Sequence, residues 1–139
     1  MSLEVRPVDP AQTRPLRQEV LRPHESLEEL ASHEPPGVHA LGAFDGEELV
    51  AVGFVCPEGG PGEWRVRGMA TKPAHRGRGA GTAILDGLVE HARANGATRV
   101  WCNARTPALS LYARAGFEPA SDEFEIEGIG PHFVMALRV

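Results

Sequence analysis

Cysteine and long apolar segments are scarce in this chain of 139 residues, and each shortage excludes a class of protein. The two cysteines, Cys56 and Cys102, lie far apart, so the sequence predicts neither a disulfide framework nor a Cys-x-x-Cys redox pair. The longest apolar run, Leu49 to Cys56, spans eight residues and is too short to cross a bilayer. The first residues also lack the apolar segment of a secretion signal. We therefore expect a cytoplasmic protein that does not bind membranes.

Metal-binding and nucleic-acid-binding patterns are missing as well. The six histidines show no His-x-x-x-His spacing, so no metal is predicted. A net charge of −5 would repel a phosphate backbone, which argues against a nucleic-acid partner. Ordinary proportions of apolar (42%) and charged (24%) residues, in a chain of this length, predict one globular domain over residues 1–139.

Glycine, by contrast, is concentrated in one informative segment, Arg76-Gly77-Arg78-Gly79-Ala80-Gly81. It follows a strand-like run, Trp64 to Thr71, and precedes a helical run, Thr82 to Ala94. Glycines at a helix N-terminus let backbone N–H groups converge on an anion such as a pyrophosphate. A solvated loop is the alternative. The P-loop and the dinucleotide fingerprint do not fit, because no Lys-Ser/Thr follows and the glycines alternate.

Two ordered motifs resemble the GNAT superfamily of N-acetyltransferases. The first is Arg/Gln-x-x-Gly-x-Gly/Ala, matched by Arg76, Gly79 and Gly81. The second is a strand ending in Asn103, followed by a helix with a Tyr before Gly116-Phe117. The segment Gly128 to His132 is similar to the Gly-Ile-Pro-His of the ElaA-like branch, with Gly130 as an extra residue. The resemblance covers nearly the whole chain.

The order of expected elements agrees with this family. The resemblance implies a GNAT α/β (α+β) fold, a central mixed, mostly antiparallel sheet flanked by helices on both faces. In the family the sheet opens between two strands, which here would end at Thr71 and Ala104. Alternation along the first of them places Trp64, Val66 and Ala70 on one face and Met69 and Thr71 on the other. The expected strands are 3–8, 38–44, 47–56, 64–71, 99–104, 124–126 and 133–138, and the expected helices are 10–22, 26–32, 82–94 and one that starts at 106–107 and ends at 116.

The resemblance implies acetyl-CoA as cosubstrate. The glycine-rich segment would bind its pyrophosphate and strand main chain its pantetheine, with Asn103 reaching the cofactor or capping the next helix. The residues implied in cofactor binding are Met69, Ala70, Thr71, Arg76, Gly77, Arg78, Gly79, Ala80, Gly81, Thr82 and Asn103. Tyr112, the only tyrosine, matches the family's general acid, which would protonate the departing thiolate. The alternative is that it packs against Leu109 and Phe117.

The general base stays open among Glu63, His132 and water, since a solvated surface role suits either side chain. A covalent route through Cys102 is disfavoured, because alternation puts Cys102 and Asn103 on opposite faces. We predict direct attack of a primary amine on acetyl-CoA in a ternary complex. The alternatives are a non-catalytic acyl-CoA-binding or regulatory domain and a basic loop that binds acidic partners.

The acceptor is predicted only as a small-molecule or peptide amine. Acidic residues in the regions expected to shape its pocket mildly favour a cationic amine. Family members often dimerise, so a homodimer is possible. The acidic residues concerned are Glu25, Glu28, Glu29, Glu123, Glu125 and Glu127.

Overall fold

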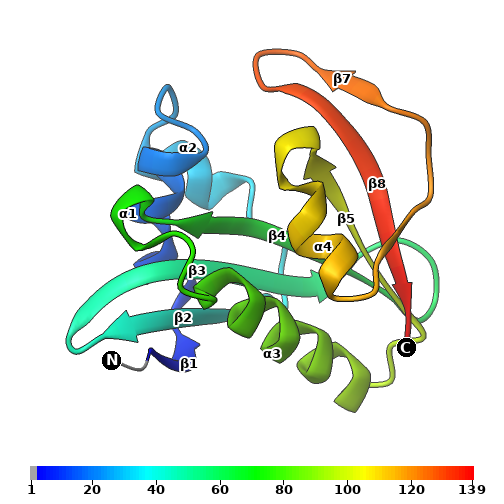
Figure 1. Ribbon diagram of the computed structural model, residues 1–139, viewed down its shortest axis with the longest axis horizontal. Helices are drawn as coiled ribbons and strands as arrows, with labels where there is room; N and C mark the ends of the chain where they lie inside the picture. The colour runs from blue at the N-terminus through cyan, green and yellow to red at the C-terminus, as the bar shows by residue number, and fades with distance from the viewer. Residues whose placement is uncertain (1–2) are drawn as a thin grey trace.

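A mixed eight-stranded sheet forms the centre of the protein in the computed structural model, which describes residues 3–139. The strand order is β1-β2-β3-β4-β5-β8-β6, and β7 pairs with β8 (Figure 1). The predicted GNAT-type sheet, mostly antiparallel with helices on both faces, is therefore confirmed. The elements in chain order are β1 (Glu4–Val8), α1 (Pro10–Val20), α2 (Leu27–Ser32), β2 (His39–Asp45), β3 (Glu48–Pro57), β4 (Glu63–Thr71), α3 (Ala80–Ala94), β5 (Arg99–Arg105), α4 (Leu109–Arg114), β6 (Glu118–Pro119), β7 (Phe124–Ile126) and β8 (Gly130–Arg138).

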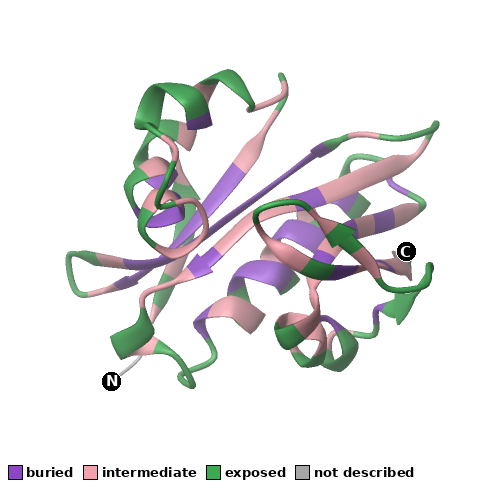
Figure 2. Cartoon of the chain, turned by 90° about the horizontal axis from the view of Figure 1, so that it is seen from above, coloured by how far each residue is buried: buried purple, intermediate pink, exposed green. Residues whose placement is uncertain are grey.

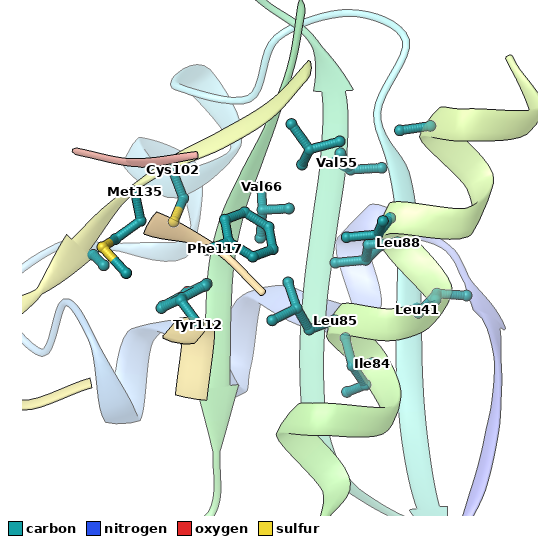
Figure 3. Packing of buried hydrophobic residues seen from close by; sticks show 14 of the residues in the cluster. Leu41, Val55, Val66, Ile84, Leu85, Leu88, Cys102, Tyr112, Phe117 and Met135 are labelled. Carbon is teal, nitrogen blue, oxygen red and sulfur yellow. The ribbon is translucent and has the colours of Figure 1, made fainter. Parts of the chain in front are cut away.

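Antiparallel strands β1 to β4 carry helices on both faces. Residues of β3 alternate between them: Ala51 and Val55 belong to the core under α3, whereas Val52 packs with Leu16 of α1. In Figure 3, Ile84, Leu85 and Leu88 of α3 point towards the sheet. Burial is concentrated in the strands and the sheet-facing side of α3 (Figure 2). The α3 face therefore carries the larger of the two apolar cores.

The sheet opens between β4 and β5. These parallel strands pair only at their starts, where Glu63, Trp64 and Arg65 oppose Arg99, Val100 and Trp101. Beyond Arg65 the two strands diverge (Figure 1), and β5 continues its antiparallel pairing with β8 as far as Arg105 opposite His132. The main chain of β4 from Val66 onward thus has no described strand partner on its β5 side. The predicted opening, between the strands expected to end at Thr71 and Ala104, lies here.

A β-bulge in β4 changes which face of the sheet its later side chains point to. Gly68 has a φ of +65°, and the pairing with β3 skips from Arg67 opposite Phe54 to Ala70 opposite Val52. The inserted residue reverses the alternation beyond it. The prediction that Val66 and Ala70 share a face is therefore wrong: Val66 and Met69 pack against the α3 core, and Ala70 packs against Leu16 of α1.

Two helix starts differ from the prediction. Helix α3 begins at Ala80, two residues before the predicted Thr82, so the last glycine of the segment lies in its first turn. Thr106 does not cap α4. It begins a 3-10 turn, Thr106–Ala108, and its hydroxyl donates to Glu123 instead. No helix of residues 3–139 is long and apolar enough to span a membrane.

Candidate active site

A cleft of about 1170 Å³ occupies the opening between β4 and β5 and continues on both sides of the sheet. Its walls come from the α1–α2 segment, β4, the glycine-rich segment, α4 and the β7–β8 turn. Eleven of the twelve predicted site residues line it: Met69, Ala70, Thr71, Arg76, Gly77, Gly79, Ala80, Gly81, Thr82, Asn103 and Tyr112. The fold thus brings together residues from three separate segments of the chain.

The glycine-rich segment ends in an uncapped helix N-terminus. Gly79, the N-cap residue of α3, has a φ of +82° and no side chain to bond the first turn. The N–H groups of Ala80, Gly81 and Thr82 have no protein acceptor among residues 3–139. A Cβ at Gly77 or Gly79 would meet nothing within 4 Å, so the space above the loop is open. Exposed N–H donors, a helix dipole and open space fit an anionic group such as a pyrophosphate.

The two arginines of this segment differ in direction. Arg76 lines the cleft. Arg78 turns away from it: its guanidinium donates to Asp45 at 3.0 Å and contacts His75 Nδ1 at 2.8 Å. The expectation that the Arg78 side chain joins the cleft is not met, because Asp45 of the β2–β3 turn holds it.

Asn103 projects into the cleft from β5. Its neighbours Cys102 and Ala104 are buried on the other face, as alternation predicted. The Asn103 amide forms no hydrogen bond within residues 3–139, so nothing described supports the alternative of a local helix cap. It is available to a bound molecule.

Tyr112 reaches the cleft from α4 while most of its ring is buried. The ring packs edge-on against Phe117, 5.7 Å between centroids. Burial, together with the neighbouring Cys102 thiol, raises the pKa of the Tyr112 phenol far above its ordinary value. The phenol therefore stays protonated throughout the physiological range. Figure 3 shows Tyr112, Cys102 and Met135 near one another at the edge of the core.

Cys102 is buried and unreactive in this setting. Burial raises the pKa of its thiol to about 12. Because the thiolate is the nucleophilic form, this environment disfavours attack by Cys102 on a thioester.

His132 lines the cleft and Glu63 does not. The Glu63 carboxylate accepts from the Gly60 N–H and from Arg99, and these bonds lower its pKa. His132 lies 2.8 Å through Nδ1 from the carbonyl oxygen of Gly130. A carbonyl can only accept, so Nδ1 carries the proton and Nε2 of the neutral ring is left as an acceptor. No described residue bonds Nε2, and that atom is not among the buried unpartnered ones.

Comparison with known proteins identifies the family. The sequence model of the Acetyltransferase (GNAT) family matches residues 7–117. The chain is also 33% identical over 140 residues to the uncharacterized N-acetyltransferase YitI of Bacillus subtilis, covering 96% of this chain and 94% of YitI. The chain belongs to the GNAT family of acetyltransferases.

Solved structures show the same fold. A putative N-acetyltransferase from Lactobacillus plantarum superposes with a TM-score of 0.82 at 18% identity, covering 99% of each chain. A Bacillus subtilis acetyltransferase in complex with CoA superposes with a TM-score of 0.78 at 17% identity, again covering 99% of each chain. The family match and the similarity to YitI confirm the predicted superfamily, while the ElaA-like branch stays a prediction.

Three arginines of this GNAT cleft, Arg17, Arg22 and Arg105, were not anticipated from the sequence. They line it together with Arg65 and Arg67. The alternation that pointed to Asn103 also places Arg105 on the cleft side of β5, so the signal was present in the sequence. Of the six glutamates thought to shape the acceptor pocket, Glu25 and Glu127 are the ones that line the cleft. The acidic character expected of this pocket is therefore wrong.

Within residues 3–139, no group of three or more His, Cys, Asp and Glu side chains is placed to hold a metal ion. The charge available for substrate binding in the GNAT cleft comes instead from the helix N-terminus and these arginines.

Proposed function

We propose that this GNAT protein transfers the acetyl group of acetyl-CoA to a primary amine by direct attack within a ternary complex. The observation that carries the proposal is the continuity of one cleft from the open N-terminus of α3 to Tyr112 and His132. The CoA-bound structural relative supports the choice of cosubstrate. The acceptor enters from the α1 side, where His132 lies.

The cosubstrate would be held mainly by main chain. Its pyrophosphate would accept from the N–H groups of Ala80, Gly81 and Thr82, and Arg76 would balance part of the phosphate charge. The free edge of β4 from Met69 to Thr71 offers N–H and C=O groups to the pantetheine amides. The Asn103 amide can bond the same arm from β5.

The chemistry requires one proton to leave the amine and one to reach the thiolate. The amine nitrogen forms the new bond to the thioester carbonyl carbon, and the carbon–sulfur bond breaks. His132 Nε2 accepts the amine proton, directly or through water, and Tyr112 donates a proton to the departing sulfur. The products are the N-acetylated amine and CoA. An acyl-CoA-binding protein without catalysis remains the alternative outcome of the test below.

The first test concerns the glycine-rich segment Arg76 to Gly81 at the start of α3, called the cradle below. Calorimetric titration with acetyl-CoA would compare the wild type with Gly81→Val. A Cβ at Gly81 would lie 3.7 Å from Leu111 and 3.9 Å from Thr71, so the two further methyls of valine would crowd the floor of the cradle. We expect micromolar binding by the wild type and at least tenfold weaker binding by the variant.

The matched control is Ala83→Val, which places the same side chain on an exposed position of α3 outside the cleft. It should bind acetyl-CoA like the wild type. Absence of binding by the wild type would refute the transferase proposal, and binding without acetylation of any amine would favour the non-catalytic alternative.

A further inference from the structure

We propose that the acceptor amine also carries an anionic group, a carboxylate or a phosphate, which binds the arginines on the α1 side of the cleft. This inference rests on the proposed function and specifies its substrate class. The chain as a whole has a net charge of −5, yet seven arginines and two glutamates are found among the described residues of the cleft wall. Two of the seven lie elsewhere: Arg76 belongs to the glycine-rich segment, and Arg114 lies on α4.

The other five arginines share the α1 side of the sheet. Arg67 is the register partner of Phe54, and the guanidinium of Arg17 lies 4.8 Å from that ring. Arg65 lies over Trp101 of β5 at 4.9 Å, which links the two strands across the point where they separate.

Arg105 extends from the far end of β5 to the segment that follows α1. Its guanidinium donates to the carbonyl oxygen of Leu21 at 3.0 Å, which brings it next to Arg22. The arginines therefore come from three separate parts of the chain and converge on one wall.

Carboxylates on this side are too few for the cations. Glu34 accepts from both Arg14 and Arg17, and Glu58 accepts from both Arg65 and Arg67. Glu25 lies 3.4 Å from Arg22 and 3.4 Å from His33. Arg105 forms no ion pair with any residue from 3 to 139. Each of these three carboxylates is thus shared, and the half-buried Arg105 guanidinium has none. Glu127, the other glutamate of the cleft wall, forms no ion pair with any residue from 3 to 139.

Two of these arginines lack a partner among residues 3 to 139, Arg65 an acceptor at one nitrogen and Arg105 a counter-charge. Arg65 Nε is buried without any acceptor, which is costly for a charged group. Burial, and secondarily the charge of Arg22, lowers the pKa of Arg105, which forms no ion pair with any described residue. A carboxylate or phosphate bound in the cleft would supply Arg105 with the counter-charge that it lacks, and the planar guanidinium matches both groups with paired N–H donors.

The position of these arginines favours the acceptor as the source of the anion. The phosphates of acetyl-CoA have their own site at the α3 N-terminus, on the other side of the opening. Arg105 is instead the register partner of His132, and partners in an antiparallel pair project from the same face. An anion at Arg105 would therefore hold the attached amine beside the His132 ring.

Matched amines test the inference directly. Acetylation would be measured for α-amino acids beside their primary amides, and for glucosamine 6-phosphate beside glucosamine, with spermidine as a cationic amine. The amide has the more weakly basic amine, so a preference for the free acid cannot come from a larger neutral fraction. We expect kcat/KM at least tenfold higher for the anionic member of one series, and the series identifies carboxylate or phosphate.

The variant Arg105→Gln should remove that preference. It should raise KM for the anionic amine at least tenfold, with kcat and acetyl-CoA affinity nearly unchanged, and Arg105→Lys should retain part of the preference. The control Arg93→Gln removes an exposed arginine of α3, paired with Glu90, and should behave like the wild type.

The outcomes separate this inference from the proposed function. Acetylation of neutral or cationic amines with no preference for anionic ones would overturn the inference and leave the transferase function intact. The inference is equally overturned if acetyl-CoA binds but no anionic amine is bound or acetylated. If acetyl-CoA does not bind, the proposed function fails, and calorimetric titration of the anionic amines decides the inference: equal affinity for wild type and Arg105→Gln overturns it.

Discussion

The two sides of the cleft present positive charge by different means. On the α3 side the donors are main-chain N–H groups of Ala80, Gly81 and Thr82, arranged by glycines and a helix start. On the α1 side they are guanidinium groups held by Glu34, Glu58 and the Leu21 carbonyl. A main-chain site depends on a short local sequence and is shared across a family. A side-chain site depends on which distant residues meet, and so it can differ between relatives that share the fold.

His132 provides the strongest test of the α1 side as the location of the base. Asparagine at this position can still donate to the Gly130 carbonyl through its amide, but it has no imidazole nitrogen to accept a proton. We expect His132→Asn to lower kcat about a thousandfold.

The control for that variant is His91→Asn, on α3, where the ring stacks on His39 outside the cleft. It should leave kcat unchanged. Full turnover by His132→Asn would assign the base to water or to another group.

A variant of Tyr112, on α4, tests the proposed general acid on the other side of the cleft. Because burial raises the pKa of its phenol, Tyr112 stays protonated as pH rises through the working range, and its ionisation should produce no alkaline limb in the wild-type profile. We expect Tyr112→Phe to lower kcat about a hundredfold while acetyl-CoA affinity changes little. Full turnover by the variant, measured by release of free thiol, would reduce Tyr112 to a packing role against Phe117.

Glu34 tests whether the arginines on the α1 side need their shared carboxylates for the stability of the folded protein. Burial alone would raise the pKa of Glu34, but the hydrogen bonds from Arg14 and Arg17 outweigh it and lower that pKa. Such a group stabilises the folded state above its unfolded pKa, about 4.3, and the contribution is lost as pH falls through the lowered folded value. Glu34→Gln should lower the free energy of unfolding at pH 7 by about 3 kcal/mol, since Arg17 would stay buried without a counter-charge.

Denaturant titration at pH 7 and at pH 3 measures that difference, which should shrink at the lower pH. The matched control is Glu90→Gln in the exposed pair with Arg93, with an expected change of no more than about 0.5 kcal/mol. Equal losses in the two variants would mean that Glu34 contributes no more than a surface charge.

Cys102 should have the smallest effect of the four. Burial in the core raises the pKa of its thiol to about 12, so the nucleophilic thiolate is scarce. Direct transfer of the acetyl group to the amine does not require this thiol. We expect Cys102→Ala to retain kcat within about threefold and to lose about 1 kcal/mol of stability, at the low end for a core truncation. Loss of all acetylation in a folded Cys102→Ala protein would instead indicate a covalent intermediate.

Much of the fold could be predicted from local patterns, because each depended on neighbouring residues. Strands β2 and β3 formed where strands 38–44 and 47–56 were predicted, and the glycine segment preceded a helix. The facing of Met69 and Ala70 was wrong because a bulge at Gly68 depends on the partner strand, where Gly53 lies opposite. Simple alternation contains no information about such an insertion.

The candidate site divides in the same way. The motif predicted a cradle whose residues do line the cleft, with Arg78 as the exception, because Asp45 lies in a different turn of the chain. The choice between Glu63 and His132 could not be made from sequence. It depends on which side chain reaches the cleft, and Glu63 is held away by Gly60 and Arg99.

The sequence by itself determined the family, the order of the elements other than the short strand β6, and the glycine-rich segment before α3, since these follow from residue types at fixed local spacing. Only the tertiary structure decided where the charges of the cleft lie. Its seven arginines are residues 17, 22, 65, 67, 76, 105 and 114, while four of the six glutamates singled out along the chain lie outside the cleft. Electrostatic interactions depend on distance in space and on shared partners, and a linear sequence specifies neither until the chain has folded.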